Sequence, residues 1–108
     1  MRITWYIQEE DSPEIEEKGL ITLEDAMILV DELEISPETV EIPQMVGFLN
    51  QDGSFLEFTR LSEDIYQVRY YDKNYDEDLI GELPIQKAIQ CLIDFFNGRR
   101  PRWCSELE

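Results

Sequence analysis

Apolar residues follow two different periods along this chain, and this constrains the fold more than any other feature of the sequence. Stretches rich in β-forming residues, many with apolar side chains at every second position, indicate strands. They cover residues 2–8, 40–49, 55–58 and 65–71, and residues 79–80 indicate a short fifth strand. Apolar residues at helical spacing indicate one helix from Thr22 to about Ile35 and another from Pro84 to Phe96.

Capping and turn residues support these boundaries. Thr22 can cap the first helix, and Pro37 predicts its end because the residue before a proline avoids helical geometry. Residues 50–53, Asn-Gln-Asp-Gly, predict a hairpin, since Gly53 can adopt the positive φ that a tight turn requires. Gly98 has the usual place of a glycine at the end of the second helix.

The predicted order of elements is therefore β-α-β-β-β-(β)-α. Short turns between successive strands favour antiparallel pairing. We expect an α+β fold, an antiparallel meander sheet of four to five strands with two helices packed on one face. The length of the chain and the absence of repeats and linkers predict a single domain over residues 1–108. Residues 9–19 and 72–78 are expected to form exposed acidic loops.

The charge of the chain is strongly negative and unevenly distributed. There are 25 acidic and 9 basic residues, a formal net charge of −16. Residues 1–41 hold 13 of the acids and 2 of the bases. Such a field repels nucleic acid and anionic membranes, so neither is an expected partner, and it speeds encounter with a basic protein. Simple solubility is the alternative explanation of the same charge.

The sequence contains no convincing catalytic motif. It has no histidine, which removes the commonest general base and a usual zinc ligand. Cys91 and Cys104 form no CxxC pair and are expected to be reduced thiols. We therefore expect no enzyme activity, no cofactor and no metal, although the abundant carboxylates leave a small hydrolase as an alternative. The chain start lacks a signal-peptide pattern and no apolar stretch is long enough to span a membrane, so we expect a cytoplasmic protein.

One segment resembles a calcium loop without completing it. Asp72, Asn74, Asp76 and Asp78 alternate as ligands do at the start of an EF-hand loop. The glycine and the distal glutamate of that loop are both absent, and the flanking residues are typical of strands. We do not expect calcium binding at this segment.

The C-terminal half resembles a family of bacterial immunity proteins. The residues that carry the resemblance are Gly47 to Gly53, Phe55 to Phe58, Phe95 to Gly98, Arg100-Pro101 and the tail Trp103 to Leu107. They are similar to immunity proteins of polymorphic-toxin and contact-dependent inhibition systems, a family that includes the immunity protein of a double-stranded-DNA cytosine deaminase toxin. The resemblance implies a small α+β domain that binds and inhibits a cognate toxin, such as a deaminase or nuclease.

Charge and expected exposure, rather than the resemblance, select the candidate contact residues. They form two acidic loops: Glu9, Glu10, Asp11, Glu14, Glu16 and Glu17 in the first, and Asp72, Tyr75, Asp76, Glu77 and Asp78 in the second. The expected partner is a cognate toxin, basic in charge, bound by a monomer or weak homodimer. The alternative is an acidic regulatory or DNA-mimic binding domain that has no cognate toxin.

Overall fold

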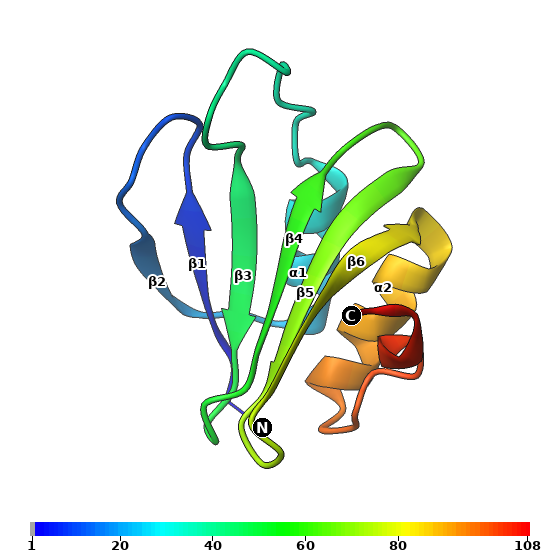
Figure 1. Ribbon diagram of the computed structural model, residues 1–108. Coiled ribbons are helices and arrows are strands. Elements are labelled where there is room, and N and C mark those ends of the chain that lie inside the picture. Colours follow the sequence, from blue (N-terminus) through cyan, green and yellow to red (C-terminus); the bar gives the residue numbers. More distant parts are fainter. Residues whose placement is uncertain (1) are drawn as a thin grey trace.

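The computed structural model describes residues 2–108 and shows one six-stranded antiparallel sheet with two helices on one face (Figure 1). The strands are β1 (Thr4–Gln8), β2 (Glu16–Leu20), β3 (Met45–Leu49), β4 (Phe55–Arg60), β5 (Ile65–Asp72) and β6 (Glu77–Pro84). The helices are α1 (Leu23–Asp31) and α2 (Ile85–Phe96), and a short 3₁₀ helix, η1, covers Cys104–Glu106. The strands lie in the order β2-β1-β3-β4-β5-β6.

Strict alternation along β5 shows how the sequence builds the core. Tyr66, Val68 and Tyr70 are buried on the helix side of the sheet, while Gln67 and Arg69 point to the other face. Burying apolar side chains on one face of a strand in this way contributes to the driving force for folding. The hydroxyl of Tyr66 donates to the Val30 carbonyl at 2.7 Å, so this buried polar group is satisfied within the core.

The predicted α+β class and antiparallel sheet are confirmed, whereas the predicted four to five strands and their order are wrong. The extra strand is β2, which lies inside the expected loop 9–19 and makes the order begin β-β-α. All five of its residues are exposed, so its sequence lacks the apolar alternation that marks a half-buried strand. Pairing with β1 makes it a strand, with Tyr6 opposite Glu17.

The last strand is also longer than predicted. β6 spans eight residues instead of the two at 79–80, and therefore includes Glu77 and Asp78 from the expected loop. Gly81 interrupts its apolar pattern. A Cβ atom at Gly81 would lie 3.1 Å from the Leu107 side chain, since the chain's C-terminal residues fold back against β6. There the Glu108 amide donates to the Ile80 carbonyl at 2.9 Å.

The first helix is shorter than predicted, and residues 40–44 are not a strand. Thr22 does cap α1, accepting from the Asp25 amide at 3.2 Å, but the helix ends at Asp31 rather than near Ile35. The guanidinium of Arg60 donates to the Asp31 carbonyl at 2.8 Å and to the Leu33 carbonyl at 3.3 Å, which satisfies carbonyls at the helix end.

The predicted hairpin and the end of α2 are confirmed. Gly53 has φ 97° in the β3–β4 turn, and Gly98 has φ 73° just after the helix. Few residues other than glycine adopt such φ angles without strain. The β3–β4 turn and the C-terminal end of α2 lie at the same end of the sheet (Figure 1).

Candidate functional site

Three segments meet at one end of the sheet and form a surface that we call the acidic end. It comprises residues 9–15, 31–44 and 61–64, at the top of Figure 1. These segments carry four, five and two acidic residues, and none of them contains lysine or arginine. All eleven of these acidic residues are exposed. No single segment has enough charge to stand out, so the fold creates this surface by bringing the three together.

The carboxylate of Asp11 holds two of these segments together. Its Oδ1 accepts from the amides of Glu41 at 3.0 Å and Ile42 at 3.3 Å. The amide of Asp11 in turn donates to the Ile42 carbonyl at 2.8 Å. Asp11 has φ 54°, a left-handed conformation that aspartate tolerates better than most residues. The third segment is joined through Arg60, which donates to the Glu63 carbonyl at 2.9 Å.

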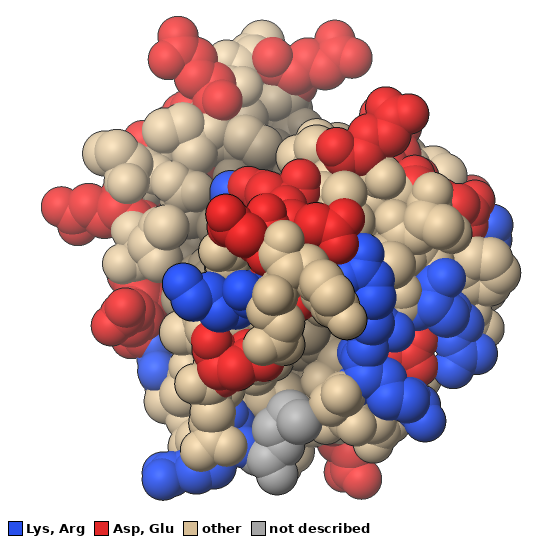
Figure 2. Space-filling view, turned by 60° about the horizontal axis from the view of Figure 1, so that its bottom comes forward, with Lys and Arg blue, Asp and Glu red and all other residues tan. Residues whose placement is uncertain are grey.

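The opposite end of the sheet collects most of the basic residues, and we call it the basic end. Figure 2 shows Lys and Arg side chains on that side of the molecule, with Asp and Glu side chains lying among them. Five of the nine lie in the segments that meet there, namely Arg2, Lys73, Arg99, Arg100 and Arg102. Three of these bases are paired with acidic residues at the same end, namely Asp72, Glu77 and Asp94. The acidic end is therefore much more negative than the basic end, a difference that a net charge of −16 alone would not reveal.

The first predicted acidic loop is divided by the fold. Glu9, Glu10, Asp11 and Glu14 belong to the acidic end, with Asp11 in the bridging role described above. Glu16 and Glu17 lie on β2 instead. Glu16 forms an exposed ion pair with Lys18 at 3.2 Å. Exposed pairs of this kind contribute little to stability, so Glu16 remains accessible to a partner.

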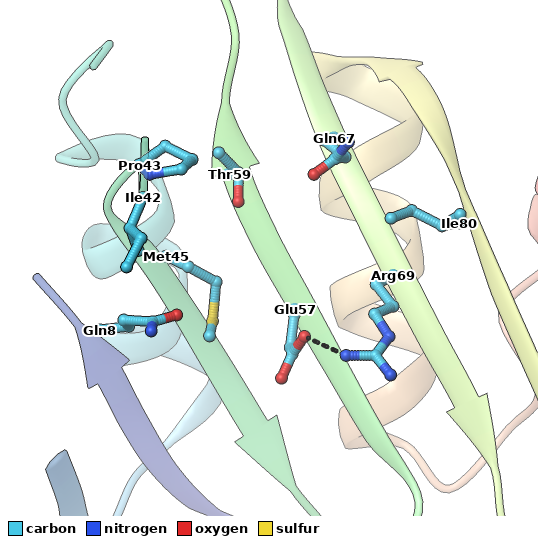
Figure 3. Close-up of a pocket in the computed structure, with 9 residues that line it drawn as sticks. All are labelled: Gln8, Ile42, Pro43, Met45, Glu57, Thr59, Gln67, Arg69 and Ile80. Atoms are coloured by element: carbon cyan, nitrogen blue, oxygen red, sulfur yellow. Dashed lines mark hydrogen bonds and ion pairs between the residues drawn. The ribbon is translucent and has the colours of Figure 1, made fainter. Parts of the chain in front are cut away.

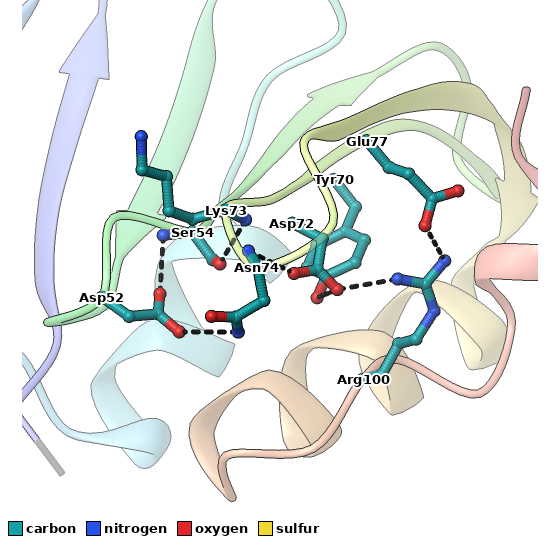
Figure 4. A network of polar contacts seen from close by, with 8 residues as sticks. All are labelled: Asp52, Ser54, Tyr70, Asp72, Lys73, Asn74, Glu77 and Arg100. Carbon is teal, nitrogen blue, oxygen red and sulfur yellow. Dashed lines mark hydrogen bonds and ion pairs between the residues drawn. The ribbon is translucent and has the colours of Figure 1, made fainter.

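The second predicted loop lies at the basic end, so the structure does not bring the two candidate loops together (Figure 1). Asp72 is buried with 3% exposure, which corrects its expected place in an exposed loop. Figure 4 shows its carboxylate accepting from the Tyr70 hydroxyl at 3.2 Å, the Asn74 amide at 3.0 Å and the Arg100 guanidinium at 2.7 Å. Asp72 therefore anchors the C-terminal segment through Arg100.

The remaining acidic residues of this loop are also paired within the chain. Glu77 accepts from Arg100 at 3.0 Å, Asp76 from the Tyr71 hydroxyl at 2.9 Å, and Asp78 from Arg69 at 2.7 Å. Tyr75 is 71% exposed at the tip of the turn, although the guanidinium of Arg100 lies 5.6 Å from its ring centroid. Tyr75 therefore presents an open aromatic surface at this turn.

A third feature, which the sequence reasoning missed, lies on the face of the sheet that neither helix covers, here called the open face. Four side chains are joined across it. The Tyr6 hydroxyl donates to Glu57 at 2.5 Å, Arg69 donates to Glu57 at 3.4 Å, and Arg69 donates twice to Asp78 at 3.0 and 2.7 Å. These residues come from β1, β4, β5 and β6, so the row crosses most of the sheet.

Glycine at position 47 allows this row to form. Tyr6 lies opposite Gly47 in the β1–β3 pairing, and a Cβ atom at Gly47 would overlap the Tyr6 ring. The ring therefore lies across β3 to reach Glu57 on β4. Burial, together with the hydrogen bond to Glu57, raises the pKa of Tyr6, so this residue acts as a neutral hydrogen-bond donor.

A hollow of about 220 Å³ opens beside this row (Figure 3). Its lining residues are Gln8, Ile42, Pro43, Met45, Glu57, Thr59, Gln67, Arg69 and Ile80. Gln8 ends β1 and Ile42 belongs to the acidic end, so the hollow adjoins that surface. Alternation in β4 and β5 shows that residues such as Glu57 and Arg69 point outward, but sequence alone does not show that they meet.

The described residues offer little sign of metal chemistry. Within residues 2–108, no group of three or more His, Cys, Asp or Glu side chains is arranged to hold a metal ion. At the EF-hand-like segment, Asp72 faces the cationic Arg100. None of the helices in residues 2–108 has the length and apolar character needed to cross a membrane. Comparisons with protein-family models, curated proteins and solved structures found no match.

Proposed function

We propose that this protein is an immunity protein that binds a basic toxin enzyme and inhibits it through the acidic end. The observation that carries the proposal is the convergence of three segments on one end of the fold, which together have eleven acidic residues and contain no lysine or arginine. The neighbouring Arg60 directs its guanidinium to backbone carbonyls of these segments. A toxin that acts on nucleic acid needs a positively charged cleft, and a surface of this kind can occupy such a cleft in place of phosphates. We place this activity in the cytoplasm.

Two further points support a binding role. The acidic end is held in shape by backbone hydrogen bonds to Asp11, so a partner meets an ordered surface and loses less entropy on binding. The resemblance of the C-terminal half to immunity proteins supplies the specific class. We propose that the protein acts as a monomer or weak homodimer, without a cofactor and without catalysing a reaction.

A pull-down from the producing cells tests this proposal. The tagged protein is incubated with cell extract at low salt, and bound proteins are identified by mass spectrometry. We expect a single stoichiometric protein, basic in charge, whose expression alone is toxic and whose toxicity disappears when the two are expressed together. Capture of a basic protein that has no toxicity would instead support an acidic regulatory or DNA-mimic domain.

A further inference from the structure

The hollow on the open face is lined by two kinds of group. Four lining residues are apolar: Ile42, Pro43, Met45 and Ile80. Four others carry side-chain oxygen atoms: Gln8, Glu57, Thr59 and Gln67. At about 220 Å³ the hollow is smaller than the range of about 300–1,000 Å³ that is usual for drug-sized ligands. It suits one protein side chain that combines an apolar stem with a polar head.

The polar part of the lining is rich in hydrogen-bond acceptors. The Nε2 of Gln8 donates to the Ser12 carbonyl at 3.0 Å, and this leaves Oε1 facing the hollow (Figure 3). Glu57 has a side-chain exposure of 13%, and its Oε1 is 3.4 Å from Arg69, a long contact that leaves this oxygen able to accept a second donor. Acceptors on opposite walls of the hollow favour a head with several donors.

Arg69 also lines the hollow, but its charge is already matched. Two nitrogens of its guanidinium donate to Asp78, and the group lies 5.1 Å from the ring centroid of Phe55. The hydrogen bonds from Arg69 lower the pKa of Asp78, as expected for a carboxylate held in an ion pair. The positive charge of Arg69 and the negative charge of Asp78 cancel. The remaining charge near the hollow comes from Glu57 and the adjoining acidic end, and it gives the hollow a negative potential.

We propose that this hollow receives one arginine side chain of a basic partner protein. A guanidinium carries five donors in a planar fork, which suits acceptors on two walls, and the aliphatic stem of arginine can pack on Met45 and Ile42. The hollow adjoins the acidic end, so one partner can contact both. The identity of the partner rests on the proposed function, whereas the preference for arginine rests on the lining.

An NMR titration of the whole protein with small probes tests the pocket. The probes are N-acetyl-arginine methylamide, its neutral citrulline analogue and the corresponding lysine compound. We expect saturable shifts of the backbone amides of Gln8, Thr59, Gln67 and Arg69 with the arginine probe. Affinity for it should exceed that for citrulline by about tenfold, because hydrogen bonds from a charged donor are stronger than those from a neutral one.

Two variants and one control sharpen the test. Gln67→Tyr should fill the hollow and abolish the shifts, while Gln86→Tyr on the exposed side of α2 should leave them unchanged. Thr59→Val removes one oxygen without adding volume and should lower the affinity for the arginine probe by about threefold to tenfold.

Several results would overturn the arginine pocket. They are the absence of saturable shifts, shifts spread over the acidic end, equal affinity for citrulline, or tighter binding of the lysine probe. The titration uses no partner protein, so any of these results would contradict the arginine pocket without bearing on the proposed function. Conversely, a failed pull-down combined with saturable arginine binding would contradict the toxin-binding function and support the pocket.

Discussion

The ring of Tyr6 occupies the space beside Gly47 where any other residue would place its Cβ atom. Gly47→Ala should therefore destabilise the protein by about 1–3 kcal/mol, as overpacking commonly does. The Tyr6 ring would have to move away from Glu57, so the row of polar contacts on the open face should break. Urea unfolding measures the change in stability.

A double variant isolates the cause. In Tyr6→Ala the ring is absent, so adding Gly47→Ala to it should cost much less than Gly47→Ala costs in the parent protein. Equal costs in both backgrounds would show that the glycine is needed for a reason other than the Tyr6 ring.

Asp94 is a buried carboxylate that organises the chain after α2. It accepts from the Arg102 amide at 3.0 Å, from the Arg102 guanidinium at 3.0 Å and from Arg99 at 3.2 Å. The hydrogen bonds from Arg102 lower the pKa of Asp94 to about 2. An aspartate in an unfolded chain has a pKa of about 3.9, so the folded state holds the charged form more strongly.

The lowered pKa of Asp94 predicts how the stability of the protein changes at acid pH. A depressed folded-state pKa contributes stability that is fully present above about pH 4 and is lost as the pH falls toward 2. Asp94→Asn should cost about 2 kcal/mol at neutral pH, and the difference from the parent should shrink between pH 4 and pH 2. Urea unfolding across this range measures it, with Glu38→Gln in the exposed 31–44 segment as a control. If the loss of stability in Asp94→Asn does not change with pH, the charge of the Asp94 carboxylate does not stabilise the folded state.

At the scale of the elements, α2 contributes a continuous apolar face to the core, with Ala88, Cys91, Leu92 and Phe95 buried. Leu92 is fully buried, and Phe96 packs edge-to-face on Phe48 with ring centroids 5.7 Å apart. Leu92→Ala should cost about 2–5 kcal/mol through lost burial and the cavity left behind. Thermal unfolding gives the comparison, and Gln86→Ala on the exposed side of the same helix is the control. An unchanged melting temperature for Leu92→Ala would show that α2 is not packed on the sheet as described.

The sequence predicted an element well where one face of that element is buried, because the buried side chains then recur at a regular spacing. α2 and β5 have one buried face each, so apolar spacing identified both. β2 has five exposed residues and is held by pairing with β1, so no local pattern distinguished it from a loop. In β6 the tail packs against Gly81, and a glycine in that place interrupts the alternation that would have shown its length.

The candidate site was harder to predict because it depends on strand order. The sequence identified acidic segments such as 9–17 and 72–78, but not that they lie at opposite ends of the sheet. The joining of residues 31–44 to residues 9–15 depends on the carboxylate of Asp11, which the sequence alone does not show contacting Glu41. The open face needed the registers of four strands to place Tyr6, Glu57 and Arg69 together.

At the scale of the whole molecule, the separation of acidic and basic ends predicts which charges matter for binding. Glu38→Gln with Glu63→Gln removes two charges from the acidic end. Glu24→Gln with Glu108→Gln removes two exposed charges elsewhere. The first pair should slow association with the captured basic partner more than the second, because local potential steers the encounter.

Stopped-flow measurements of association at several salt concentrations check this prediction. The rate for the parent protein should fall by about tenfold or more between low and high salt, since exposed charges are screened beyond the Debye length. Equal slowing by both pairs of substitutions, or a rate that does not depend on salt, would contradict steering by the acidic end.

The polarity along the strands also affects motion before contact. A body that concentrates its unpaired negative charge at one end, and pairs acids with bases at the other, has a large dipole moment. The field of a nearby basic protein exerts a torque on that dipole. Rotational diffusion of so small a protein is fast, so the torque has time to turn the acidic end toward the partner while the two still approach. The placement of Arg99, Arg100 and Arg102 far from the acidic end thus reduces the fraction of collisions that begin in the wrong orientation.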